Sequence, residues 1–468
     1  MCRTEDLHQI LAAMKRAHLN ASPVSADTRR GRLNRSVQLI RQHRDALVAA
    51  MSADFGNRSV YQSTAADLAT TVNMLAHAAQ QVEAWMAPEA VATHNPNVRA
   101  WIQPQPLGVV GVISPWNFPI NLAFGPLAGV FAAGNTALLK PSELTPRTSE
   151  LLAELVGRYF DPMELGVVLG DAHVGETFST LPFDHLVFTG STQVGRKIMR
   201  AAAENLVPVT LELGGKSPVV VLPDADVTMA AERTLTVKAF NAGQICLAPD
   251  YVLLPAGQEA AFADAARQFM ATAYPRMQGH ADYTSVVSDR HYARLLSLIE
   301  NARNKGARVL SLAPAGEPDA DPATRKIAVH LILGATDDMT VMQEEIFGPL
   351  LPVRTYATVD EAIAYINAHP RPLAAYLFGG DAQAQRHFAD RTTSGALVIN
   401  DVMTHAAIET LPFGGVGASG MGAYHGIHGF RRFSHAKAVA QQHGEGPAVE
   451  RLRPPYADKL APLQAALG

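Results

Sequence analysis

Cysteine is nearly absent from this sequence. Its 468 residues contain two cysteines, Cys2 and Cys246. Two cysteines cannot build a disulfide framework, so we expect Cys246 to be a free thiol and the protein to occupy a reduced, cytoplasmic setting.

The sequence also lacks an excess of either charge and any long apolar run. Lys and Arg total 39 against 43 Asp and Glu, which leaves a net charge of −4 and no broad footprint for nucleic acid or anionic lipid. No segment approaches the roughly 18 consecutive apolar residues of a membrane span, and the start, MCRTEDLHQI, lacks the apolar core of a signal peptide. With 48% hydrophobic and 18% charged residues, we expect a globular protein without nucleic-acid or membrane partners.

Several familiar catalytic patterns are missing as well. The 17 histidines include no H-E-x-x-H, and no C-x-x-C occurs, so we expect no metal site. The sequence contains neither a paired-carboxylate spacing nor a G-x-S-x-G elbow. These absences disfavour glycosidase and serine-hydrolase chemistry.

The periodicity of apolar residues predicts an α/β protein. Residues 1–90 show helical spacing, and the extended segment 93–106 is typical of an arm or edge strand. From residue 107, short apolar runs alternate with Ala-rich helical stretches, and a second such alternation runs from 217 to about 405. This pattern predicts parallel sheets with helices on both faces. The proline-containing segment 443–468 is expected to be an irregular tail.

The most informative thiol lies in NAGQICLAP, on a Gly-containing turn between a helix and a strand. Cys246 on such a turn is a candidate nucleophile, because a thiolate can attack only where substrate reaches it. On position alone, a buried and inert core thiol is the commoner role for a free cysteine.

Two polar residues follow predicted strands. Glu212, just before Gly214 and Gly215 in LELGGKSP, can project into a cleft as a general base, or it can be an exposed edge carboxylate. Asn117 in PWNFP offers two amide N–H groups for an oxyanion, although a helix N-cap is an alternative role.

Further motifs are compatible with nucleotide binding. Lys140 and Glu143 in LLKPSE follow a strand where α/β sheets bind nucleotides, and their alternative is a solvated charged turn. Gly190 opens a helix in FTGSTQVG, where backbone N–H groups suit a pyrophosphate. Glu345 and Phe347 in QEEIFGP would alone indicate a surface turn.

A literal G-x-G-x-x-G occurs in PFGGVGASGMG, at Gly415, Gly417 and Gly420. It follows no good hydrophobic strand, and no clear βαβ unit surrounds it, so we reject it as a dinucleotide fingerprint. A flexible loop near a cleft is the better interpretation.

The joint order of these motifs is far more specific than any one of them. PWNFP, LLKPSE, FTGSTQVG, LELGGKSP, NAGQIC, EEIFGP and PFGGVGASGMG together resemble the NAD(P)-dependent aldehyde dehydrogenase superfamily over about residues 25 to 440. The APDY after the cysteine and SGMGAYHG resemble its class 3 branch, which includes the coniferyl aldehyde dehydrogenases. Some class 3 relatives end in a hydrophobic membrane anchor, which this tail lacks.

The resemblance implies a fold and a division of the chain. A Rossmann-type parallel-sheet cofactor domain would comprise residues 1–92 and 107–212, and an α/β catalytic domain residues 213–405. A small β oligomerisation arm would comprise residues 93–106 and 426–442. A Gly-rich loop, residues 406–425, would return to the cofactor domain, and the implied assembly is a homodimer.

The resemblance also implies the roles of individual residues. Cys246 matches the nucleophile and Glu212 the general base, while Asn117 and the Cys246 backbone N–H would form the oxyanion hole. The positions that match the cofactor site are Lys140 and Glu143 for the adenosine ribose, Gly190 and Ser191 for the pyrophosphate, and Glu345 with Phe347 for the nicotinamide ribose.

The implied reaction is oxidation of an aldehyde to the acid through a thiohemiacetal and a thioester on Cys246. Glu212 would activate the water that releases the acid, and aromatic or medium-chain aldehydes are the expected substrates. Glu143 favours NAD, since a carboxylate would repel a 2′-phosphate, although class 3 relatives often accept NADP. The alternatives are a CoA-acylating relative, against which Glu212 argues, and a non-catalytic binding protein, which no feature supports.

Overall fold

The N-terminal part of the molecule is a bundle of helices. The structure, a computed structural model, describes residues 4–444 and 446–467. The helices are α1 Thr4–Ala21, α2 Ala26–Gln42, α3 Arg44–Phe55, α4 Val60–Gln62, the π-helix η1 Ser63–Ala69, and α5 Thr70–Met86. The helical prediction for this part of the chain is confirmed. The apolar faces of α2 and α5 pack on α6 (Asn121–Ala132), because an amphipathic helix is stable only where its apolar stripe is covered.

A six-stranded sheet carries one side of the candidate site. Its strand order is β17-β7-β6-β3-β4-β5, parallel except for β17. The strands are β3 Val109–Ile113, β4 Thr136–Lys140, β5 Leu165–Val167, β6 His185–Thr189, β7 Val209–Glu212 and β17 Gly420–Met421. The remaining helices of this half are α7 Pro146–Tyr159, α8 Ala172–Ser179 and α9 Thr192–Ala203. Strands β3, β4 and β6 are buried along their whole length, as expected for a parallel sheet covered on both faces.

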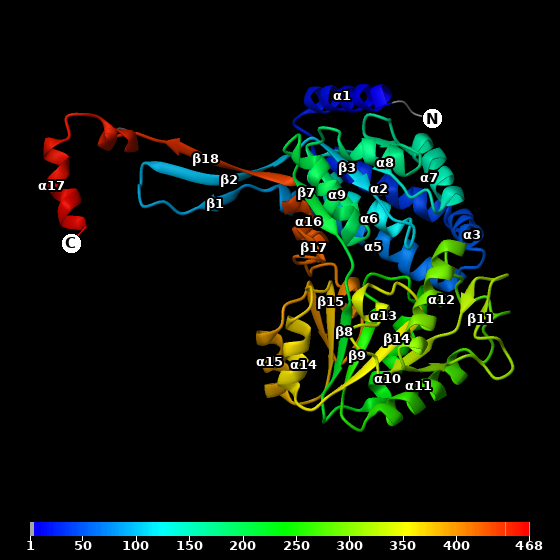
Figure 1. The fold of residues 1–468 in the computed structure, drawn as a ribbon. Coiled ribbons are helices and arrows are strands. Elements are labelled where there is room, and N and C mark those ends of the chain that lie inside the picture. Colours follow the sequence, from blue (N-terminus) through cyan, green and yellow to red (C-terminus); the bar gives the residue numbers. More distant parts are fainter. Residues whose placement is uncertain (1–3, 445, 468) are drawn as a thin grey trace.

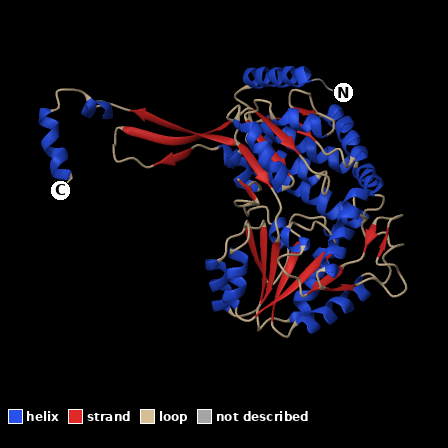
Figure 2. Cartoon of the chain, viewed as in Figure 1, coloured by secondary structure: helices blue, strands red, loops and turns tan. Residues whose placement is uncertain are grey.

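A seven-stranded sheet forms the other half, in the order β10-β13-β14-β9-β8-β15-β16, with only β10 antiparallel. Its strands are β8 Ser217–Val221, β9 Pro249–Pro255, β10 Arg308–Ser311, β13 His330–Leu333, β14 Leu350–Tyr356, β15 Ala374–Phe378 and β16 Ala396–Ile399. The accompanying helices are α10 Val227–Ala239, η2 Phe240–Gly243, α11 Glu259–Ala273, α12 Asp289–Asn304, α13 Thr340–Gln343, α14 Val359–Asn367, α15 Ala382–Arg391 and η3 Thr404–Ala407. A short pair, β11 Ala320–Asp321 and β12 Lys326–Ile327, lies beside it. Figure 2 shows the strands of this sheet flanked by helices. The predicted α/β class with parallel sheets is confirmed.

A three-stranded antiparallel arm projects from the body (Figure 1). It consists of β1 Glu89–Val91, β2 Val98–Pro106 and β18 Ser434–Gln442. Strand β1 joins the arm although the predicted arm begins at residue 93, because Glu89–Val91 pairs with β2. Residues 426–432 were expected in the arm, but they form α16 (Gly426–Arg432), which packs on α6. The division into functional domains stays a prediction.

The C-terminal tail contains regular structure. Residues 443–468 were predicted to be irregular, yet the 3-10 helix η4 (Ala448–Leu452) and helix α17 (Ala457–Ala466) lie there. That prediction is wrong for these segments. The Ala and Leu residues of ADKLAPLQAA are good helix formers, and they outweigh the single interior Pro462. Across the described part of the chain, no helix is both long and apolar enough to cross a membrane.

Candidate active site

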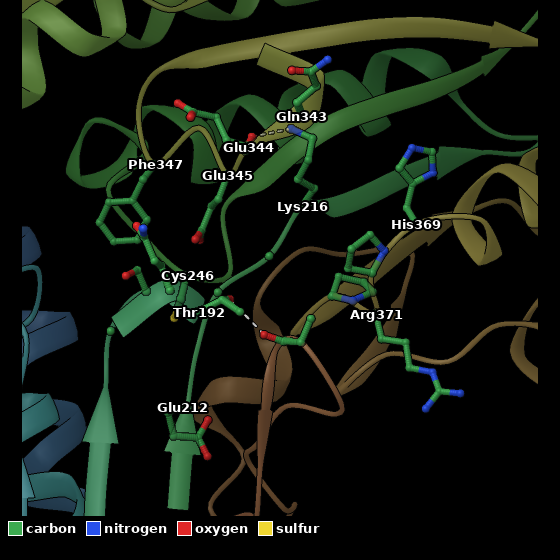
Figure 3. Close-up of a pocket in the computed structure, with 18 of the residues that line it drawn as sticks. Thr192, Glu212, Lys216, Cys246, Gln343, Glu344, Glu345, Phe347, His369 and Arg371 are labelled. Atoms are coloured by element: carbon green, nitrogen blue, oxygen red, sulfur yellow. Dashed lines mark hydrogen bonds between the residues drawn. The ribbon is translucent and has the colours of Figure 1, made fainter. Parts of the chain in front are cut away.

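A cavity of about 760 Å³ lies between the two halves of the molecule. Residues from both sheets line it, and Figure 3 shows Glu212 and Glu345 on opposite sides, with Cys246 between them in this view. The predicted site residues among its lining are Asn117, Gly190, Ser191, Glu212, Cys246, Glu345 and Phe347. The fold therefore brings together residues that are up to 230 positions apart.

Cys246 reaches this cavity through an unusual turn. Asn241, Ala242 and Gly243 all have positive φ, at 49°, 53° and 70°, and such a run of left-handed residues persists only where the surroundings hold it. The surroundings do so: Gln62 Oε1 accepts a hydrogen bond of 2.9 Å from the Asn241 backbone N–H. A Cβ on Gly243 would collide with the Gly348 carbonyl, so only glycine fits there. Cys246 is a partly exposed free thiol, so it is not fully buried in the core.

The environment of Cys246 favours the protonated thiol. Burial raises the pKa of Cys246 to about 12, and the nearby Glu345 and Glu212 carboxyls act in the same direction. A thiol with this pKa is a weak nucleophile at neutral pH. Nucleophilic attack by Cys246 would therefore need a base that accepts its proton.

Glu212 is a buried carboxyl to which no described residue forms a hydrogen bond. It is the last residue of β7, opposite Gly420 of β17 and Thr189 of β6. Neither carboxylate oxygen has a hydrogen-bond partner among the described residues. Burial raises the pKa of Glu212 well above its usual value, and the charge of Arg432 opposes that shift. A carboxyl in a cavity with a raised pKa is a candidate general acid or base.

Asn117 is held against the turn that carries Cys246. Its Nδ2 donates a 3.1 Å hydrogen bond to the Gln244 carbonyl, and its own carbonyl accepts one of 3.2 Å from Asn241 Nδ2. Asn117 is buried, yet it lines the cavity. A side-chain amide has a second N–H group, so Asn117 can also donate to an oxyanion formed on Cys246.

A buried ion pair fixes the segment that follows Asn117. Asp67 Oδ1 accepts hydrogen bonds from the backbone N–H groups of Ile120 (3.1 Å) and Asn121 (2.8 Å) at the start of α6. Asp67 Oδ2 accepts one of 2.8 Å from Arg58, and both side chains are fully buried. Sequence reasoning missed Arg58 and Asp67. They lie at least 50 positions before Asn117, and no sequence pattern indicates that they contact the segment that follows it.

The N-terminus of α9 forms another wall. Ser191 is its N-cap and accepts a hydrogen bond from the Val194 backbone N–H. The predicted Gly-rich loop lies beside it: Thr192 Oγ1 donates to the Ala418 carbonyl at 2.9 Å, and the Leu213 backbone N–H donates to the Ser419 carbonyl at 3.0 Å. The backbone N–H groups of this helix terminus can receive a phosphate group.

Glu345 and Phe347 form the opposite wall, not the surface turn that their motif alone would indicate. Burial raises the pKa of Glu345 to about 8. A Cβ on Gly214 would collide with the Glu345 carboxyl, so this glycine makes room for it. Phe347 has a φ of +49° and meets the Trp116 ring edge-on, with 5.4 Å between ring centroids.

Lys140 and Glu143 are not among the residues that line the cavity. They lie at the carboxyl end of β4, where Lys140 Nζ donates a 2.8 Å hydrogen bond to Glu143 Oε2. Their predicted contact with a ribose stays a prediction.

The residues of the cavity fit a nicotinamide dinucleotide. The N-terminus of α9, with Gly190 and Ser191, can bind a pyrophosphate, and the Glu345 carboxyl can accept hydrogen bonds from ribose hydroxyls. Within residues 4–444 and 446–467, no group of three or more His, Cys, Asp or Glu side chains could hold a metal ion.

Comparisons with known proteins agree with this geometry. A family model described as "Aldehyde dehydrogenase family" matches residues 1–439. The chain is 55% identical over 463 residues to the coniferyl aldehyde dehydrogenase of Pseudomonas sp. (strain HR199 / DSM 7063), covering 99% of this chain and 96% of the relative. It is 38% identical over 440 residues to the 4,4'-diaponeurosporen-aldehyde dehydrogenase of Staphylococcus aureus (93% and 94% covered).

Solved structures give the same result. The substrate-bound state of Staphylococcus aureus AldH superposes with a TM-score of 0.92 at 35% identity, covering 98% of this chain and 99% of that one. An indole-3-acetaldehyde dehydrogenase in complex with NAD+ superposes with a TM-score of 0.86 at 27% identity, covering 94% and 90%. This chain belongs to the aldehyde dehydrogenase family and is an NAD(P)-dependent enzyme that oxidises an aldehyde to the carboxylic acid.

Proposed function

We propose that Cys246 is the nucleophile of this reaction and Glu212 its general base. The observation that carries the proposal is the presence, in one cavity, of a partly exposed free thiol and a buried carboxyl without a hydrogen-bond partner in the described chain. The thiol can form a thioester with the substrate, and the carboxyl can take a proton from the water that hydrolyses it. The two residues therefore complement each other chemically.

In the first half of the reaction, Cys246 Sγ attacks the aldehyde carbon. A C–S bond forms, the C=O electron pair moves to oxygen, and the thiol proton leaves to solvent water. Asn117 Nδ2 and the Cys246 backbone N–H donate to the resulting oxyanion. As the oxyanion re-forms the C=O bond, the former aldehyde carbon gives up its hydride, and a thioester remains on Cys246. A bound nicotinamide nucleotide would supply the hydride acceptor, and Glu345 and Phe347 would hold its nicotinamide ribose.

In the second half, Glu212 removes a proton from a water molecule while the oxygen of that water attacks the thioester carbon. The C–S bond breaks, the acid leaves, and the thiol of Cys246 is restored. Glu212 also distinguishes this reaction from CoA acylation, in which a thiol rather than an activated water would release the acyl group.

Replacing Asn117 with alanine tests the oxyanion role. Loss of one such donor typically costs about 10²–10³ in kcat, and we expect a loss of that size with little change in the KM for NAD. Steady-state kinetics with both substrates varied would measure it. A kcat close to wild type would contradict the assignment of Asn117.

The substrate class that we infer is aromatic aldehydes of the coniferyl type. Support comes from the 55% identity to a coniferyl aldehyde dehydrogenase and from the aromatic wall of the cavity, where Trp116 meets His291 (5.2 Å between centroids) as well as Phe347. Flat rings pack well against such edge-to-face aromatic groups.

An NADH-release screen of aliphatic, benzylic and cinnamyl aldehydes tests this inference. We expect the highest kcat/KM with a cinnamyl aldehyde such as coniferyl aldehyde, because its conjugated ring can pack along the aromatic wall. Running each aldehyde with NAD and with NADP also tests the proposed NAD preference, since a 2′-phosphate near Glu143 would be repelled. A medium-chain aliphatic aldehyde with the highest kcat/KM would reject the proposed substrate class.

We further infer a homodimer in the cytoplasm. Strand β18 is an edge strand of the projecting arm, and an edge strand offers unpaired backbone groups to another chain. The scarcity of cysteine supports a reducing compartment.

A further inference from the structure

Arg432 is a charged residue close to the candidate active site. The proposed reaction gives it no role. It is the last residue of α16, on the segment that leads into the arm. Its Nε donates a 2.9 Å hydrogen bond to Thr210 Oγ1, and its Nη2 donates to the Val209 carbonyl. The guanidinium is thus attached to β7 at two points.

The attachment places the guanidinium on the same side of β7 as Glu212. Side chains two residues apart on a strand face the same side of the sheet, so Thr210 and Glu212 project together. Neighbouring Val209 and Leu211 face the opposite side, where they belong to a separate hydrophobic cluster. The charge of Arg432 therefore lies beside a carboxyl that has no hydrogen-bond partner of its own in the described structure.

The surroundings are shaped to hold Arg432 in this place. His185 Nε2 lies 2.8 Å from Thr210 Oγ1, and burial lowers the pKa of His185 to about 3. A neutral His185 can accept the Thr210 hydroxyl hydrogen, which leaves the Thr210 oxygen to accept from Arg432. Gly422, with a φ of +82°, passes close beneath the guanidinium, and a Cβ there would lie 2.9 Å from Arg432 Nε.

We propose that Arg432 is a positioning residue for the hydrolytic half of the reaction, whose fixed positive charge favours the form of the Glu212 carboxyl that accepts a proton from water. This inference rests on the proposed role of Glu212 as the base. Among the described residues, the titratable groups that interact electrostatically with Glu212 are Cys246, Tyr424 and Arg432. Among them only Arg432 carries a positive charge.

The sign of the effect follows from the charges. Burial raises the pKa of Glu212, and Arg432 lowers it again by favouring the carboxylate. A base works only above its pKa. Removing the charge of Arg432 therefore moves the acidic limb of the pH–rate profile for thioester hydrolysis to higher pH. A neighbouring opposite charge typically shifts a carboxyl pKa by about 1 unit or more. We therefore expect a shift of about one pH unit and, below both pKa values, about tenfold slower hydrolysis.

The test is stopped-flow kinetics of the full-length enzyme with saturating aldehyde and NAD across pH. The rate of the NADH burst reports hydride transfer, and the steady-state rate after the burst reports hydrolysis. For Arg432→Gln we expect an unchanged burst rate and an acidic limb of hydrolysis moved upward. Arg432→Lys keeps the positive charge, so its acidic limb is expected to lie close to that of the wild-type enzyme.

Arg431→Gln is the matched control, because Arg431 is the exposed neighbour on the same helix. It removes the same charge away from the site and should leave the acidic limb in place. If Arg432→Gln does not fold, Thr210→Val removes the hydrogen-bond acceptor instead, and a smaller upward shift is expected. A folded Arg432→Gln enzyme whose limb matches that of Arg431→Gln would overturn the inference, as would equal losses in burst and hydrolysis.

Glu212→Gln separates the two proposals. If Glu212→Gln leaves hydrolysis unchanged, the proposed base is wrong and the role of Arg432 fails with it. If Glu212→Gln stops hydrolysis while Arg432→Gln leaves the limb unmoved, only the role of Arg432 is wrong. In an enzyme with both substitutions, we expect no loss beyond that of Glu212→Gln alone.

Discussion

Cys246→Ala is expected to abolish NADH formation with every aldehyde. Without Sγ no thiohemiacetal forms, and the aldehyde carbon cannot give up its hydride at a useful rate. The substitution removes one atom from a side chain that already borders a cavity, so we expect the fold to persist. NADH absorbance with purified variant and circular dichroism would measure the two effects.

The control for this variant is Cys2→Ala, which removes the chain's only other cysteine and is expected to retain full turnover. Binding of NAD to Cys246→Ala, measured by fluorescence quenching, should persist because the thiol is not one of the groups proposed to hold the cofactor. Sustained dehydrogenase turnover by Cys246→Ala would refute the covalent mechanism.

Glu212→Gln is expected to give a burst of NADH followed by very slow turnover. The amide has the same shape as the carboxyl but cannot take a proton from water, so the thioester accumulates. Loss of a general base typically costs about 10²–10⁴ in rate. The carboxyl has no hydrogen-bond partner among the described residues, so the amide breaks no such bond and we expect no loss of thermal stability.

Glu345→Gln is the matched control, since Glu345 is another carboxyl of the same cavity whose pKa burial raises. Its proposed partner is the cofactor ribose, so we expect a raised KM for NAD without a burst. Rapid-quench detection of acyl-enzyme would distinguish the two variants. Unchanged steady-state turnover in Glu212→Gln would show that another group activates the water.

Much of the secondary structure could be predicted from local pattern. The continuous apolar runs of LGVVGVI and DHLVFTG predict buried parallel strands, and β3 and β6 are buried throughout. The prediction of an irregular tail was wrong, because its prolines were given more weight than its helix-forming residues, and α17 lies there. The predicted start of the arm was wrong as well. Glu89–Val91 belongs to the arm because it pairs with β2, and a local sequence pattern does not show pairing between strands.

The residues of the site were predicted less completely than the secondary structure. The motif order indicated seven residues that line the cavity, together with Lys140 and Glu143, which do not. Single positions were less informative: Cys246 alone favoured a core thiol, and Glu345 alone a surface turn. No local signal indicated that Arg58 and Asp67 hold the start of α6. These roles arise from contacts between segments far apart in the chain.

The sequence by itself determined the α/β class, the free thiol and, through the joint order of its motifs, the family. Only the tertiary structure decided the chemical state of the site. It buried Glu212 where no described residue forms a hydrogen bond with it, and it raised the pKa of Cys246. It also placed Arg432 beside Glu212, although the two are 220 residues apart. The physical reason is that a pKa depends on desolvation and on neighbouring charges in space, and the fold alone sets both.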